Sequence, residues 1–173
     1  MSLRQALLLA GLLAAAGAGT AAEPEGLPAD RRCGLPVFQD ALLQAINAAR
    51  AQTRLCGATA MNAATPLRWN GRLFDAAARH AADMAQHDYL SHTGRDGRSV
   101  AQRAQAAGYG WTAIGENLAA GPDSVPEVVA GWLASPGHCA NLMKADFAEV
   151  AVSCVHRPGN RYGHYWTMVL GHR

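Results

Sequence analysis

Two histidines and one glutamate are the strongest candidates for chemistry, because each lies in an irregular, glycine-bearing segment. His92 belongs to the S-H-T-G sequence at 91–94, Glu116 to the G-E-N sequence at 115–117, and His138 directly follows S-P-G. Functional side chains are found disproportionately in such segments. Two imidazoles and one carboxylate can hold zinc or another divalent cation, with water as the fourth ligand. The same groups can do acid–base chemistry without a metal or only order loops by hydrogen bonding, and their spacing does not separate these alternatives.

The remaining polar candidates carry a weaker signal. Ser135 precedes one of these histidines, but the sequence shows no oriented base that would activate it as a nucleophile. His80 and His87 are spaced so that they share one helix face, where a half-buried polar edge is expected. His156 and His164 lie on two expected strands, and alternation could bring them together on a sheet surface.

The sequence lacks several motifs that define common enzymes. It has no H-E-x-x-H, no G-x-S-x-G and no Walker-type loop. Its formal net charge is +2, and Lys144 is the only lysine among scattered arginines. This charge gives no basis for binding nucleic acid or an anionic membrane surface.

The N-terminus predicts export from the cytoplasm. Arg4 is followed by a short run of apolar and small residues that ends in a small-x-small pattern before Glu23. This pattern is typical of a secretory signal peptide, here residues 1–22. An uncleaved anchor is the alternative, but the run is shorter than the roughly 20 residues of a membrane span. After cleavage we expect a flexible leader over 23–36, one domain over 37–173 and no membrane span, in a secreted or periplasmic protein.

The four cysteines indicate an oxidising compartment. Cys33, Cys56, Cys139 and Cys154 form an even set behind the signal peptide, which predicts two disulfide bonds. Three connectivities are possible, and we favour the local pairs Cys33–Cys56 and Cys139–Cys154. Zinc thiolate ligation is less favoured, because the sequence contains no C-x-x-C pair.

The first half of the domain is predicted to be mainly helical. Apolar residues at helical spacing predict a helix from Pro36 to about Arg50, and a small-residue loop follows over 58–66. Asn70 is expected to cap a helix over 71–87.

Two further helices are predicted from capping-box patterns. S-x-x-Q at 99–102 predicts a helix that runs to about residue 107, and S-x-x-E at 124–127 predicts one that runs to about residue 133. The segment over 109–121 is glycine-rich and is expected to be irregular. A short helix is expected over 138–143.

The end of the chain predicts a β-hairpin. Residues 149–156 alternate without charge on either side, which indicates a strand covered on both faces. A turn sequence at 157–160 separates it from a second strand over 162–172. Helices first and a hairpin last indicate an α+β domain with helices packed on a small, mainly antiparallel sheet.

Five motifs in this order make the sequence similar to the CAP superfamily, which groups cysteine-rich secretory proteins, antigen 5 and pathogenesis-related proteins and is also called the SCP domain. The form resembles the bacterial branch of the superfamily. The motifs are S-H-T-x-x-D-G at 91–97, G-E-N-L at 115–118, W-x-x-S-P-G-H-x-x-N-L at 132–142, F-x-E-V at 147–150 and Y-W-T at 165–167. The resemblance implies a three-layer α-β-α sandwich with a central cleft.

The resemblance also implies a site. The family cleft holds two histidines and two glutamates that can bind zinc or another divalent cation; His92, Glu116 and His138 match three of these positions. The fourth position falls on Ser135, and Glu149 does not fill it. The cleft is then expected to be lined by these residues together with Asn117 and Asn141.

The resemblance allows three functions. The first is an extracellular binding module whose cleft takes a divalent cation and a small or lipidic ligand, such as a lipid or sterol. The second is a metal-assisted hydrolase of a peptide or cell-wall substrate, in which Glu116 or a histidine activates water. The third is a protein-interaction domain in which the His–Glu cluster is purely structural.

Overall fold

The computed structural model describes residues 28–173, so the predicted signal peptide and the first part of the predicted leader lie outside the described residues. The elements run in the order η1 (Ala29–Arg31), α1 (Phe38–Arg50), β1 (Arg54–Cys56), β2 (Thr59–Met61), β3 (Arg68–Trp69), α2 (Gly71–His87), α3 (Val100–Ala106), β4 (Ala113–Ala120), α4 (Val125–Ala134), α5 (Pro136–Met143), β5 (Glu149–His156) and β6 (His164–His172). In residues 28–173 no helix is both long and apolar enough to cross a membrane.

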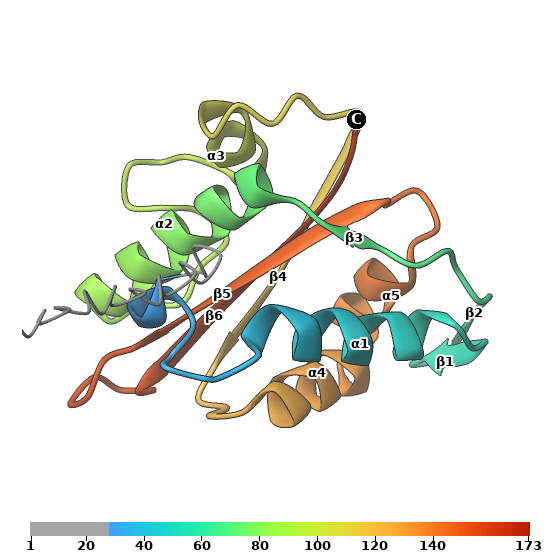
Figure 1. Cartoon of the computed structure of the whole chain (residues 1–173), viewed down its shortest axis with the longest axis horizontal. Coiled ribbons are helices and arrows are strands. Elements are labelled where there is room, and N and C mark those ends of the chain that lie inside the picture. The colour runs from blue at the N-terminus through green and yellow to red at the C-terminus, as the bar shows by residue number, and fades with distance from the viewer. Residues whose placement is uncertain (1–27) are drawn as a thin grey trace, which may run out of the picture.

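A four-stranded sheet in the order β3-β5-β6-β4 forms the middle of the molecule (Figure 1). The predicted hairpin is confirmed, because β5 and β6 pair antiparallel from Glu149–Gly171 to His156–His164. β4 pairs antiparallel with β6 on its other side, and β3 adds a short parallel edge to β5. The sheet is therefore mainly antiparallel, as the order of helices and strands in the sequence predicts.

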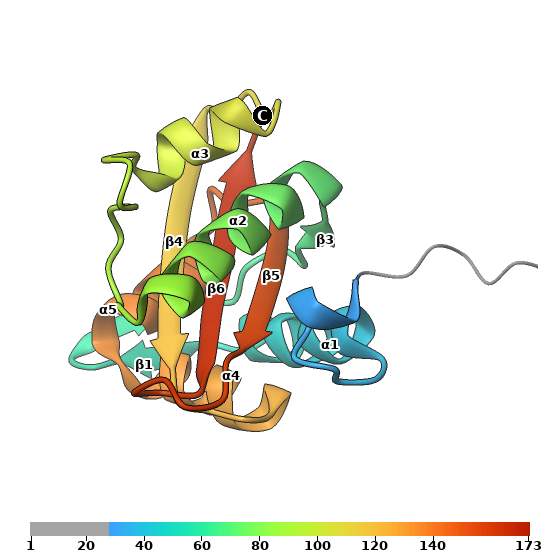
Figure 2. The ribbon, with the colours of Figure 1, turned by 90° about the vertical axis from the view of Figure 1, so that its left-hand side faces the viewer.

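Helices cover both faces of this sheet, which confirms the predicted three-layer architecture. α2 and α3 lie on one face, and α1, α4 and α5 lie on the other (Figure 2). Alternation along β5 separates the two cores: Val150 and Val152 pack with α1, α4 and α5, whereas Ala151 packs with α2. All three side chains are fully buried, because an uncharged strand between two helix layers buries both faces.

Side-chain hydrogen bonds confirm the predicted starts of two helices, α2 and α3. The Asn70 side chain accepts from the backbone N–H groups of Arg72 and Leu73, so it caps α2 as expected. Ser99 and Gln102 form a complete capping box at the start of α3. These caps fix where α2 and α3 begin above the sheet.

The segment over 109–121 was expected to be irregular, and this prediction is wrong. Residues Ala113–Ala120 form β4, which pairs with β6 along its whole length. Its sequence contains three alanines, one glycine and one asparagine and has low intrinsic strand propensity, so tertiary pairing decides its conformation. The consequence is that Glu116 projects from a strand and not from a loop.

Several element boundaries differ from the predictions. The side chain of Ser124 forms no cap on α4, and the Glu127 carboxylate instead accepts from the Asp123 N–H at 3.2 Å. α5 begins at Pro136, whose fixed φ suits a first helical turn. The predicted loop over 58–66 contains β2, which forms a short hairpin with β1.

The predicted cysteine pairing is wrong. The disulfides join Cys33 to Cys154 and Cys56 to Cys139, with Cα–Cα distances of 5.2 and 5.4 Å. β5 brings Cys154 beside Cys33, whose backbone N–H donates to the Cys154 carbonyl at 2.9 Å. The first bond holds the segment before α1 on β5, and the second holds β1 on α5.

We predict that replacing both Cys33 and Cys154 with alanine destabilises the domain. The bond spans a sequence separation of 121, and the chain-entropy relation for so long a loop gives an upper bound of about 4–5 kcal/mol. Urea unfolding of the oxidised parent and variant measures the difference. Equal unfolding free energies would contradict the prediction, as would a non-reducing peptide map that links Cys33 to Cys56.

Candidate functional site

Glu116 is the centre of the site, and both of its carboxylate oxygens are engaged by side chains. Oε1 accepts from Nδ1 of His92 at 2.8 Å, and Oε2 accepts from a terminal guanidinium nitrogen of Arg103 at 2.5 Å. The Glu116 and Arg103 side chains are only 2% and 8% exposed, whereas the His92 side chain is 61% exposed. A buried ion pair from β4 to α3 therefore supports an exposed imidazole on the 91–98 loop.

Arg103 also holds the loop that carries His92. Its guanidinium donates to the backbone carbonyls of His92 at 3.2 Å and Arg98 at 2.6 Å. His80 adds a further bond from α2, where its Nε2 donates to the Ser91 carbonyl at 2.8 Å. The loop is thus fixed on both sides of His92.

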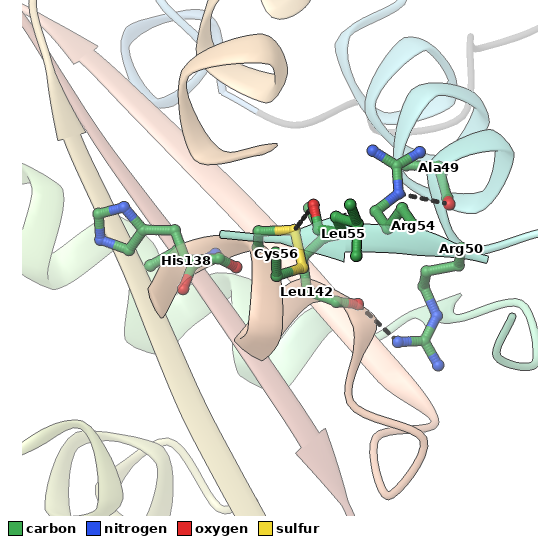
Figure 3. Close-up of a disulfide and its surroundings, with 9 residues drawn as sticks. Ala49, Arg50, Arg54, Leu55, Cys56, His138 and Leu142 are labelled. Carbon is green, nitrogen blue, oxygen red and sulfur yellow. Dashed lines mark hydrogen bonds between the residues drawn. A yellow bond between two sulfur atoms is a disulfide. The ribbon is translucent and has the colours of Figure 1, made fainter. Parts of the chain in front are cut away.

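His138 reaches the same region from the opposite helix layer. The Asn117 side chain donates to the His138 carbonyl at 2.9 Å, and the Asn141 side chain donates to the Glu116 carbonyl and to Oδ1 of Asn117, each at 3.0 Å. These asparagines hold α5 against β4. The His138 ring points away from Cys56 (Figure 3) and accepts or donates no hydrogen bond within residues 28–173.

Gly115 is required for this approach. A Cβ atom at Gly115 would lie 2.7 Å from the Phe147 ring and 2.9 Å from Oδ1 of Asn141. Both distances are far below ordinary van der Waals contact, so any larger residue would push α5 and the segment that follows it away from β4. In the G-E-N sequence, Gly115 therefore allows close packing, Glu116 supplies the carboxylate and Asn117 donates the hydrogen bond to α5.

The two histidines have opposite pKa shifts. The hydrogen bond to Glu116 raises the pKa of His92 above its usual value, against a smaller opposing effect of partial burial. Burial lowers the pKa of His138, and the positive charge of nearby His92 lowers it further. At neutral pH His138 therefore holds a free lone pair beside an imidazole that is polarised by a carboxylate.

The structure brings together most of the residues that the sequence singles out. His92 and Glu116 are bonded directly, and Asn117 and Asn141 bind the backbone around them. Ser135 lies between α4 and α5, where its backbone carbonyl accepts from the Cys139 N–H at 2.8 Å. No three His, Cys, Asp or Glu side chains within residues 28–173 converge as a metal-binding group.

Arg103 is the residue of the candidate site that the sequence motifs do not indicate. It lies on α3 next to fully buried Ala104 and pairs with a glutamate on a strand that was not expected. The capping box of Ser99 and Gln102 was a signal in the sequence, because it fixes the start of the helix and so the side of the helix on which Arg103 lies, toward the sheet.

Three other histidines, His80, His156 and His164, make contacts that support loops or strands. His80 was expected at a half-buried edge but is only 1% exposed, because it supports the 91–98 loop. Alternation allowed His156 and His164 to come together, and their rings stack with centroids 4.3 Å apart.

The fold and these motifs place the chain in a known family. Residues 43–170 match the Cysteine-rich secretory protein family, CAP, and the chain belongs to this family. A relative from Bacillus subtilis (strain 168), the Uncharacterized membrane protein YlbC, is 30% identical over 86 residues. That match covers 50% of this chain but only 25% of YlbC.

Solved structures share the fold. An extracellular protein containing a SCP domain from Bacillus anthracis superimposes with a TM-score of 0.62 at 24% identity, over 79% of this chain and 42% of that chain. An outer surface protein from Borrelia burgdorferi gives a TM-score of 0.58 at 23% identity, over 64% of this chain and 80% of that chain. At these identities the likeness establishes the three-layer architecture alone.

We predict that Glu116→Gln lowers the pKa of His92 and destabilises the domain. The parent pKa is raised, so the contribution of His92 to stability is complete below about pH 6.5 and is lost as the pH rises through the folded pKa. In the variant the NMR titration midpoint of His92 should fall toward about 6.5. Stability should fall by about 3–5 kcal/mol, because Arg103 is left buried without its counter-charge.

An unchanged His92 midpoint in the folded variant would show that the hydrogen bond does not set the pKa. An unchanged unfolding free energy would show that Arg103 finds another partner.

Proposed function

We propose that this chain is an extracytoplasmic CAP domain that acts as a binding module, with a divalent cation held at the face of His92 and His138. Two disulfides are typical of proteins in oxidising compartments. Two structural relatives, one described as an extracellular protein and the other as an outer surface protein, support the same location.

The observation that carries the cation proposal is the hydrogen bond between Glu116 and Nδ1 of His92. Metal-binding histidines commonly donate one ring nitrogen to a carboxylate, which fixes the tautomer and makes the other nitrogen a better ligand. Here that arrangement leaves Nε2 of an exposed ring available. Arg103 keeps the carboxylate in place, so Glu116 would support a ligand and would not itself be one.

The chemistry of the donors fits a weak site for zinc or a similar cation. His92 and His138 would supply two imidazoles, and water or an external ligand would complete the shell. When bound, the cation would act as a Lewis acid toward an oxygen of that external ligand. The external ligand is proposed to be a small or lipidic molecule.

A hydrolase is the second candidate, and one observation favours it. The His138 ring has a lowered pKa and makes no hydrogen bond to the described part of the chain, so it is available as a general base. Glu116 is not available for this role, because both oxygens are already bound. Turnover of a peptide or cell-wall substrate that disappears in folded His138→Ala would favour this candidate.

We predict that zinc binds the oxidised protein with micromolar affinity and that a His92→Ala/His138→Ala double variant loses this binding. Isothermal titration calorimetry measures both proteins, and circular dichroism checks that the variant is folded. His164→Ala is the matched control, because it removes the stacked histidine pair at the hairpin end. Undiminished binding in the double variant would overturn the site; no binding in the parent would leave the interaction-domain function, with Glu116 purely structural.

We predict that the bond between Cys56 and Cys139 supports zinc binding more than the other disulfide does. Cys139 follows His138 on α5, so the bond to β1 fixes the helix that carries the second imidazole (Figure 3). A Cys56→Ser/Cys139→Ser variant should bind zinc several-fold more weakly at a temperature where it is folded. A Cys33→Ser/Cys154→Ser variant is the control, and an equal loss in both would contradict a local effect.

A further inference from the structure

Two histidines face each other where β5 ends and β6 begins (Figure 1). His156 and His164 are directly opposite partners in the antiparallel register, so their side chains leave the same side of the sheet with Cβ atoms about 4.5–5.5 Å apart. Their rings stack with centroids 4.3 Å apart and an interplanar angle of 10°. His156 is exposed and His164 is half-buried, so solvent reaches both residues.

The ring nitrogens of this stacked pair are free to bind a ligand. Within residues 28–173 the histidine rings that form hydrogen bonds are those of His80, His87, His92 and His172. Neither ring of the stacked pair is held by such a bond. Partial burial lowers the pKa of His164, and the charge of its stacked partner lowers it further. The His164 ring is therefore neutral at pH 7 and has a free lone pair.

A carboxylate lies beside the stacked pair, on the segment between β4 and α4. The Gly121 N–H donates to the His164 carbonyl at 3.0 Å. The Trp166 indole donates to the Pro122 carbonyl at 2.7 Å. These two bonds hold the segment against the first residues of β6. Asp123 comes next in the segment, is exposed, and is near enough to oppose the lowering of the His164 pKa.

From this geometry we propose that the stacked pair is a chelating site for Cu²⁺. One nitrogen of each ring would bind the ion, and water and the Asp123 carboxylate would take other positions. Imidazole suits Cu²⁺, which binds a given set of donors more tightly than the other divalent first-row ions do. Because the rings are stacked in parallel, each must turn about its Cβ–Cγ bond to direct a nitrogen at one shared ion. No hydrogen bond of these rings within residues 28–173 opposes that rotation.

This site is separate from the proposed cation site at His92 and His138. The stacked rings have no carboxylate hydrogen bond of the kind that Glu116 gives to His92, and such a bond makes the imidazole a better ligand. Zinc also binds these donors more weakly than copper does. Zinc at the concentration that fills the first site is therefore expected to leave the stacked pair empty.

The test is a titration of Cu²⁺ into the oxidised His92→Ala/His138→Ala variant, which lacks the imidazoles of the other site. Calorimetry should give one strongly bound copper per chain, with a micromolar dissociation constant. Electron spin-echo modulation of the bound copper should show two imidazoles. The same titration of the parent protein should give a second strong site, so the result does not depend on the double variant alone.

His156→Ala and His164→Ala should each weaken copper binding at this site by about tenfold or more, because a single imidazole cannot chelate and loses the effective concentration of the second donor. His172→Ala is the matched control, since His172 is exposed at the other end of β6 and lies opposite Ala113, not opposite a histidine.

Three results would overturn the proposal: no copper binding in the His92→Ala/His138→Ala variant, a signal from only one imidazole, or equal binding after His156→Ala. A loss in His172→Ala as large as that in His156→Ala would also overturn it. Zinc binding in the parent tests the His92 and His138 site independently, so failure of one site is distinguished from failure of the other.

Discussion

The buried ion pair between Glu116 and Arg103 is the constraint on which the site depends. Taking a carboxylate and a guanidinium out of water is costly, and the cost is offset only where the geometry is good and the remaining donors are satisfied. Here the second carboxylate oxygen binds His92 and the guanidinium also binds two loop carbonyls. The charges therefore fix one arrangement of β4, α3 and the 91–98 loop, and the position of His92 follows from it.

The edge position of β4 explains how the second helix layer reaches the same site. An edge strand has backbone groups that no neighbouring strand satisfies. The Asn141 side chain donates to the Glu116 carbonyl and the Trp132 indole donates to the Leu118 carbonyl, each at 3.0 Å. Side chains of α4 and α5 thus cover the edge of the sheet. His138 lies on α5 and is therefore held close to β4.

Local signals in the sequence were sufficient for much of the fold. Asn70 predicts the start of α2 because a side-chain cap acts within one turn, and the alternation in β5 predicts burial of both faces because side chains of a strand point alternately to each side. The resemblance of the motifs to CAP proteins predicted the three-layer architecture.

Features that depend on contacts distant in sequence could not be predicted in this way. β4 has few strand-forming residues and exists because β6 pairs with it. The local pairing favoured for Cys139 and Cys154 was wrong because the two cysteines bind partners on different elements, β1 and the segment before α1. Arg103 was missed for the same reason: nothing near it in the sequence shows that β4 will present a carboxylate.

The hydrogen bonds of Glu116 change the role that the G-E-N motif suggests for this carboxylate. Three matched residues suggest three ligands, but a carboxylate bound by both a guanidinium and an imidazole has little capacity left for a cation. Glu116 acts instead on His92, whose pKa it raises. The pKa of His138 is lowered, so its ring is neutral at pH 7. The two imidazoles of His92 and His138 would then be the protein ligands of the proposed cation. The proposed site would keep most of the coordination shell for an external ligand, which would suit a module that binds through the cation better than one that stores it.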